Sequence, residues 1–143
     1  MLYLPKAEYD DIRNHAHEAY PHECCGVLLG RFLKSGARVQ ATAHCTNLRT
    51  DSPQLRYEID PRELVRVQRE ARESGLEIVG FYHSHPDHLP HWSPTDLNDA
   101  HWIGYSYVIV SVAQGKPTEM KSFVLSGTRE EDKVFEEEQV VLE

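Results

Sequence analysis

The stretch that decides the fold of this 143-residue chain runs Glu77-Ile78-Val79-Gly80-Phe81-Tyr82-His83-Ser84-His85-Pro86 and, after six further residues, Ser93-Pro94-Thr95-Asp96. Its first six residues form an apolar run that predicts a buried strand. Because residues i and i+2 of a strand point to the same face, His83 and His85 can converge on one ion. With Asp96 they make a two-histidine, one-carboxylate set, which suits zinc and leaves its fourth position open, as catalytic sites do.

Ser93-Pro94-Thr95-Asp96 is also a helix-start pattern, with Ser93 as the N-cap and proline at the first helical position. We expect a helix over about 94–103. The capping and metal-binding interpretations are compatible, because a fixed helix start would aim Asp96 and Ser93 toward the histidine strand.

A second His-x-His pattern, His15 and His17, falls in a predicted helix over residues 6–19. On a helix, residues i and i+2 lie about 200° apart, so these two side chains cannot share an ion. We expect them to be surface histidines.

Periodicity and turn signals place the other elements. We expect strands or strand-like segments at 24–31, 38–46, 57–60, 105–112, 120–125 and 134–142, a loop at 47–55, and a helix that begins at an Asp60 cap and stops at Ser74-Gly75. This order predicts an α/β (α+β) fold, a single-domain mixed β-sheet flanked by helices. The domain would span residues 1–143, with its core at about 3–125.

Composition narrows the class of protein. The formal charge of −8 argues against nucleic-acid binding, and residues 130–143 hold seven acids against one base, which predicts an acidic C-terminal strand or tail. No apolar run is long enough for a membrane helix, and no signal peptide is visible. Three cysteines, two of them adjacent, are a poor disulfide framework, so we expect a cytoplasmic protein.

A zinc hydrolase also needs a base that takes the proton of the attacking water. Glu23 is the candidate, because it immediately precedes the apolar run that starts at Cys24 and would lie at the mouth of the sheet. Judged in isolation, Glu23 would be an ordinary exposed glutamate where a helix meets a strand.

Together these residues resemble the signature of the JAMM (MPN-plus) metalloproteases, which is an upstream glutamate, His-x-His-Pro, six residues and Ser-x-x-Asp. Here the pattern is Glu23, His83-Ser84-His85-Pro86 and Ser93-Pro94-Thr95-Asp96, with no departure in spacing. The resemblance covers roughly residues 3–125. It implies the JAMM/MPN sandwich, which is similar to that of cytidine deaminases.

The resemblance also implies roles. His83, His85 and Asp96 would bind one Zn²⁺ per chain, Glu23 would act as general base and then acid, and Ser93 would bind the oxyanion. Such enzymes hydrolyse a peptide or isopeptide bond after the C-terminal Gly-Gly of a ubiquitin-like protein. The short chain looks more like the small prokaryotic members, which act on ubiquitin-like or sulfur-carrier proteins and either release cysteine or trim the tail; the sequence leaves both open.

Three alternatives compete with this interpretation. A noncatalytic MPN-type protein-binding scaffold would have lost ligand residues, whereas this chain keeps them. A zinc deaminase would need His-x-Glu and Pro-Cys-x-x-Cys, which are absent from the sequence. A histidine-rich metal-storage module would not need Glu23 or Ser93. The segment 134–142 could close the sheet or pair with a second copy of the chain.

Overall fold

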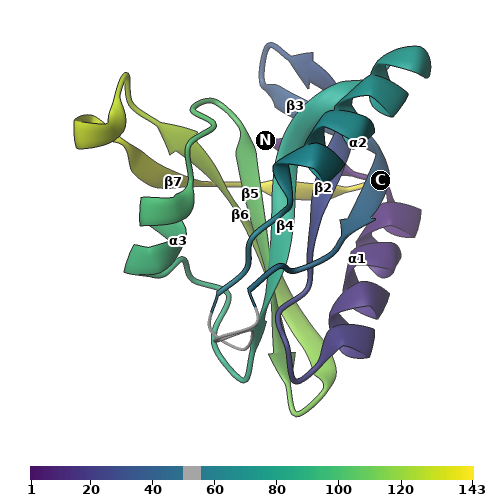
Figure 1. Cartoon of the computed structure of the whole chain (residues 1–143), viewed down its shortest axis with the longest axis vertical. Coiled ribbons are helices and arrows are strands. Elements are labelled where there is room, and N and C mark those ends of the chain that lie inside the picture. The colour runs from purple at the N-terminus through teal and green to yellow at the C-terminus, as the bar shows by residue number, and fades with distance from the viewer. Residues whose placement is uncertain (50–55) are drawn as a thin grey trace.

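The structure, a computed structural model, describes residues 1–49 and 56–143, and these residues form one α+β domain built on a mixed sheet (Figure 1). The strands are β1 (Leu2–Leu4), β2 (Cys25–Leu33), β3 (Gly36–Cys45), β4 (Glu77–Pro86), β5 (Ser106–Ala113), β6 (Lys116–Ser126), β7 (Val134–Glu138) and β8 (Val140–Leu142). The helices are α1 (Lys6–Ala19), α2 (Pro61–Glu73), α3 (Pro94–Asp99) and η1 (Glu130–Asp132), a 3-10 helix of one turn. Most of the predicted loop 47–55 lies outside the described residues.

The strand order is β7-β6-β5-β4-β2-β3-β1-β8. The pairs β4–β5, β1–β3 and β1–β8 are parallel and the others are antiparallel, which confirms the predicted mixed sheet. Within the described ranges, no helix has the length and apolar character needed to cross a membrane.

Each face of the sheet buries its own apolar cluster. On one face α1 contributes Ile12 and Ala16, which pack with residues of β1, β2, β3, β4 and β5. On the other face α2 contributes Val67, which packs with a cluster that includes Phe81 of β4 and Phe135 of β7. The two faces are therefore covered by helices from different parts of the chain (Figure 1), as in a layered α+β domain.

The prediction of one strand over 134–142 was wrong. The segment breaks at Gln139, so that β7 pairs with β6 at one edge of the sheet while β8 pairs with β1 at the other. The main-chain oxygen of Gln139 accepts a hydrogen bond from Leu2 N at 2.9 Å. Because Gln139 alone separates β7 from β8, the two edges of the sheet come close together where the chain passes from one to the other. The segment thus borders the sheet on both sides, and the three-residue β1 was missed by the prediction.

The prediction of a helix over 94–103 was wrong in length, because α3 ends at Asp99. Ala100 is already extended, with φ −87° and ψ 126°. Beyond it the indole of Trp102 packs edge-on against Phe81, with ring centroids 5.0 Å apart, and Trp102 N donates to the Tyr107 hydroxyl at 3.1 Å. Burial of this indole competes with continuation of the helix, which leaves α3 as a short element.

Candidate metal centre

Strand β4 extends through Pro86, and so His83 and His85 lie within the strand rather than in the loop after it. Both are buried, and their Nε2 atoms lie 3.2 Å apart. The parallel pairing with β5 continues from Gly80 to Pro86, which holds both histidines in extended conformation. The structure therefore places them on one face, as their spacing predicts.

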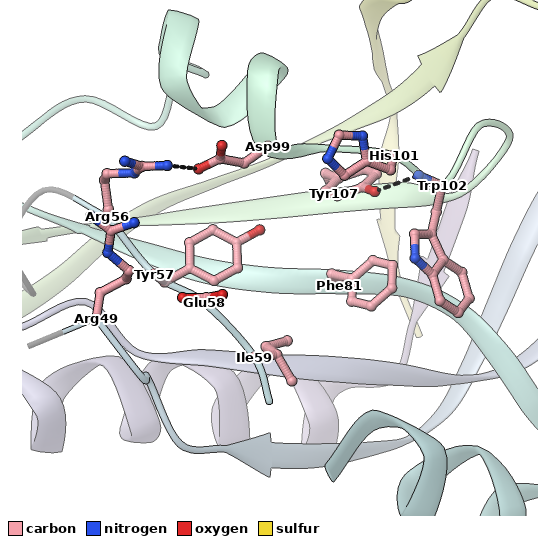
Figure 2. A pocket seen from close by; sticks show the side chains of 10 residues that line it. All are labelled: Arg49, Arg56, Tyr57, Glu58, Ile59, Phe81, Asp99, His101, Trp102 and Tyr107. Carbon is pink, nitrogen blue, oxygen red and sulfur yellow. Dashed lines mark hydrogen bonds and ion pairs between the residues drawn. The ribbon is translucent and has the colours of Figure 1, made fainter. Parts of the chain in front are cut away.

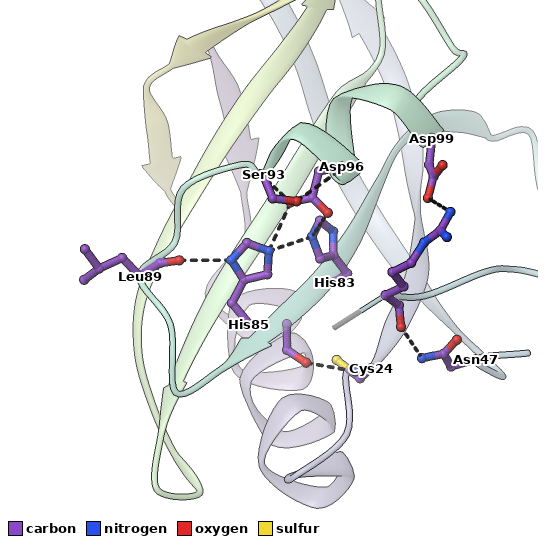
Figure 3. Close-up of polar contacts among 10 residues, drawn as sticks. Cys24, Asn47, His83, His85, Leu89, Ser93, Asp96 and Asp99 are labelled. Carbon is purple, nitrogen blue, oxygen red and sulfur yellow. Dashed lines mark hydrogen bonds and ion pairs between the residues drawn. The ribbon is translucent and has the colours of Figure 1, made fainter. Parts of the chain in front are cut away.

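Asp96 reaches the two histidines from the start of α3 (Figure 3). Its Oδ1 lies 3.3 Å from Nε2 of His83, and its Oδ2 lies 3.1 Å from Nε2 of His85. Ser93 is the N-cap: its Oγ accepts from Asp96 N at 3.0 Å, and Asp96 Oδ2 accepts from Ser93 N at 2.9 Å. This capping box fixes the carboxylate in place, and the O–H hydrogen of Ser93 is left over for another acceptor.

Glu23 joins the cluster from the start of β2. Its backbone is fixed by its neighbour, because Cys24 N donates to Ser84 Oγ at 2.8 Å and Ser84 N donates to Cys24 O at 3.2 Å. Glu23 is 5% exposed, and it offers a ligand atom that lies within 4.8 Å of those of His83 and His85. Glu23 is therefore not an ordinary exposed glutamate.

Burial controls ionisation at this centre. It raises the pKa of Glu23 to about 9, and the nearby charge of Asp96 adds to this effect. Burial also lowers the pKa of His83 against the opposing pull of Asp96, which favours the neutral imidazole that binds metals. Burial alone would raise the pKa of Asp96, but its contacts with His83 and His85 hold it below the ordinary value.

Contacts behind the two histidines orient their rings. Nδ1 of His85 lies 3.0 Å from the carbonyl oxygen of Leu89, and donation to it leaves Nε2 with a free lone pair (Figure 3). The ring of His83 stacks on Tyr57, with centroids 4.4 Å apart and planes at 23°. Both rings therefore present Nε2 to the same point.

The donor set fits a metal ion. Two nitrogen lone pairs 3.2 Å apart repel each other unless a cation lies between them, and a carboxylate adjoins both. Among the described residues, Glu23 Oε1 is buried and has no hydrogen-bond partner. A buried polar atom without a partner costs free energy, so its place beside two imidazoles is explained by a cation. The centre is thus a buried His-His-Glu group, with Asp96 adjoining, that can bind metal.

A hollow of about 320 Å³ adjoins the centre through Tyr57, which is one of its walls (Figure 2). Aromatic side chains line much of it, including Phe81, Trp102 and Tyr107, and the charged pair Arg56–Asp99 lies at its side, with 2.8 Å between Nη2 and Oδ2. The sequence analysis missed this hollow, because its walls come from segments that no motif connects.

The other predicted histidines stay away from the centre. Nδ1 of His15 lies 2.7 Å from the Tyr82 hydroxyl, and Nδ1 of His17 lies 2.6 Å from Gly115 O, so the pair shares no ligand. His17 is exposed, but His15 is half-buried and stacks on His44, with centroids 4.0 Å apart, and so it is more than a surface residue.

Comparisons with known proteins agree with this geometry. The sequence profile described as prokaryotic homologs of the JAB domain matches residues 5–126. A desampylase from Haloferax volcanii is 42% identical over 106 residues, which are 71% of this chain and 74% of that protein. A CysO-cysteine peptidase from Mycobacterium tuberculosis is 31% identical over 121 residues, which are 84% and 80% of the two chains.

A solution structure of a Desulfitobacterium hafniense protein superposes with a TM-score of 0.85 at 31% identity, and the match covers 100% of this chain and 93% of that one. The profile match spans most of the chain, and the relatives cover more than two thirds of it. The resemblance seen in the sequence is thereby confirmed: the chain belongs to the family of prokaryotic homologs of the JAB domain and is a metalloprotease of the JAMM class.

Proposed function

We propose that the protein is a zinc-dependent peptidase that hydrolyses the peptide or isopeptide bond after the C-terminal Gly-Gly of a ubiquitin-like or sulfur-carrier protein. One observation carries the proposal: four donor groups from three separate segments, three of them buried, meet at one point, and one of their oxygens has no hydrogen-bond partner in the described chain. A capping or packing role explains each residue alone but not their convergence.

The roles follow from position. His83, His85 and Asp96 would bind the ion. Zinc would supply a Lewis acid and a coordinated water whose pKa is about 7. Glu23 would take the proton of the attacking water on its carboxylate and pass it to the leaving amine. The hydroxyl of Ser93, whose oxygen already accepts from Asp96 N, would donate its hydrogen to the oxyanion of the tetrahedral intermediate.

The substrate class rests on the relatives, since one is named a desampylase and another a CysO-cysteine peptidase. The hollow beside Tyr57 supports it with space for a peptide segment next to the centre. Cysteine release and tail trimming both leave the carrier protein with a free Gly-Gly carboxylate. The released fragment, a cysteine or a longer tail, therefore distinguishes them. The three thiols are free and buried, which supports a reducing cytoplasmic setting.

The test is metal content combined with cleavage. The wild type and His83→Ala are analysed for zinc and incubated with ubiquitin-like proteins that carry either a C-terminal cysteine or a longer tail after Gly-Gly, and the products are identified by mass spectrometry. We expect about one zinc per wild-type chain, cleavage after Gly-Gly, and loss of both in His83→Ala. A wild type that binds zinc but cleaves none of these substrates would contradict the proposal and favour a noncatalytic binding scaffold.

A further inference from the structure

A hydrogen-bond junction that the proposed chemistry does not use lies beside the metal centre. Asn47 follows β3, and its side-chain Nδ2 donates to the carbonyl oxygens of Glu23 at 3.3 Å and Arg56 at 3.1 Å. Its Oδ1 accepts from the backbone N–H groups of Arg49 at 3.0 Å and Glu58 at 3.1 Å. An asparagine amide has two N–H donors and two lone pairs, so its bonding capacity is fully used.

These bonds join segments that are remote along the chain. One partner, Glu23, lies two residues before β2. Two others, Arg56 and Glu58, belong to a connector whose described residues form an isolated bridge between Asn47 and Ile59 and no strand. Few other backbone bonds hold this connector within the described chain. The side-chain amide is therefore a main determinant of where the connector lies relative to β2.

The hydrogen bonds of Asn47 reach two segments, and each segment carries a side chain that belongs to the metal centre or contacts it. On one side Asn47 binds the main chain of Glu23, whose carboxyl lies against the histidines. On the other side it binds the two residues that flank Tyr57, whose half-buried ring stacks on His83. The amide thus connects the two walls of the site that Glu23 and Tyr57 form.

We propose that Asn47 is a positioning residue of the metal centre, because its amide fixes the Glu23 carboxyl and the Tyr57 ring relative to His83. The expected effect on hydrolysis rests on the proposed function, in which Glu23 moves the proton. The expected effect on the ion does not depend on a substrate, because the orientation of His83 follows from its stack on Tyr57. A displacement of about 1 Å in such a group can lower a rate by about 100-fold.

The variant that tests this is Asn47→Asp. It keeps the size and the accepting oxygen of the side chain but replaces the donating NH₂ with an oxygen that repels the two carbonyls. We expect kcat on a Gly-Gly fusion to fall about 10–100-fold while KM stays within about twofold. We also expect the visible absorption spectrum of the cobalt(II)-substituted protein to change, because this spectrum reports ligand geometry.

The matched control is Asp132→Asn. Asp132 also binds backbone, since its Oδ1 accepts from Thr128 N at 2.8 Å and Arg129 N at 3.0 Å, but both partners are within four residues of it along the chain and neither belongs to the centre. This control should lower the melting temperature and leave kcat and the cobalt spectrum unchanged. If Asn47→Asp does not fold, Asn47→Ser, which keeps one donor, should show the same changes to a smaller degree.

The proposal would be overturned if Asn47→Asp had both the kcat and the cobalt spectrum of the wild type. If only Asn47→Ser folds, the same result in that variant would overturn it. The same losses in Asp132→Asn would overturn it as well, because the effect would then be general destabilisation. If the wild type cleaves no Gly-Gly substrate, the proposed function fails, and the cobalt spectrum still decides whether Asn47 positions the centre.

Discussion

Ser93 and Asp96 hold each other in place: Ser93 Oγ accepts from Asp96 N at 3.0 Å, and Asp96 Oδ2 accepts from Ser93 N at 2.9 Å. The same Asp96 carboxylate lies 3.1–3.3 Å from Nε2 of both His83 and His85. One side chain therefore both stabilises the start of α3 and adjoins the two histidines, so a single substitution can separate the two effects.

Asp96→Asn should separate them. The amide oxygen of asparagine can still accept from Ser93 N, so the melting temperature of the metal-free protein should change by only a few degrees. A neutral amide is a poor zinc ligand, so bound zinc should fall from about one per chain to near zero after dialysis, measured by elemental analysis. Asp99→Asn, on the same helix, is the control and should keep its zinc; retention of zinc by Asp96→Asn would show that Asp96 is not a ligand.

Glu23→Gln should keep the metal and lose hydrolysis. Burial raises the pKa of Glu23 to about 9, so in the metal-free protein this side chain is neutral at pH 7 and glutamine matches its shape and charge. Loss of a general base lowers kcat by about 10²–10⁴-fold, which a single-turnover assay on a Gly-Gly fusion can measure. Glu77→Gln, at the exposed start of β4, serves as the control, and near-normal kcat in Glu23→Gln would remove Glu23 from the mechanism.

Glu138→Ala should destabilise the fold away from the centre. Glu138 Oε2 accepts from the hydroxyls of Ser106 at 2.6 Å and Ser122 at 2.7 Å, and both serines are buried. Without the carboxylate these hydroxyls have no acceptor there, which costs about 1–3 kcal/mol. Guanidinium unfolding measures the loss, with the exposed Glu136→Ala as control; equal stability of the two variants would refute the prediction.

The protein should lose stability in acid through His15. Burial lowers the pKa of His15 to about 4, and the nearby His44 adds to this effect. In the unfolded chain the pKa is about 6.5, so the unfolded state binds the proton first. The stabilising contribution is complete above pH 6.5 and is lost as the pH falls toward 4.

Urea unfolding of the wild type and His15→Gln at pH 7 and pH 4.5 checks this linkage. When the pH is lowered from 7 to 4.5, the free energy of unfolding should fall less in His15→Gln than in the wild type. Asn14 is an exposed neighbour on α1, and the control variant Asn14→Gln should behave as the wild type. Equal pH dependence in His15→Gln and the wild type would mean that His15 is protonated in the folded protein.

Local rules predicted the parts of the centre that lie close together in sequence. The two-residue period of a strand placed His83 and His85 on one face, and cap chemistry placed Ser93 and Asp96 at a helix start. Glu23 is 60 residues before His83; its place before the apolar run at Cys24 made it a candidate, and the resemblance to a known family connected the two. The i, i+2 rule also correctly separated His15 from His17.

The remaining features depend on tertiary contacts that leave no local pattern. Asn47 binds four backbone groups, three of them 9 to 24 residues away along the chain, and as a single residue it is no different from any loop asparagine. The early end of α3 follows from burial of Trp102 against Phe81. The break at Gln139 follows from pairing with two different strands: β7 pairs with β6, the strand before it, whereas β8 pairs with β1 at the other end of the chain.

The pairing of β1 with β8 has a consequence for how the chain acquires its structure. Leu2 lies opposite Val140, so this contact closes a loop that contains nearly every residue. Contacts of such large sequence separation form slowly because of their loop-closure entropy. The residues of the metal centre lie in β4, in α3 and just before β2, and these segments are synthesised before β8. We therefore expect the part of the sheet around the metal centre to form before β1 pairs with β8.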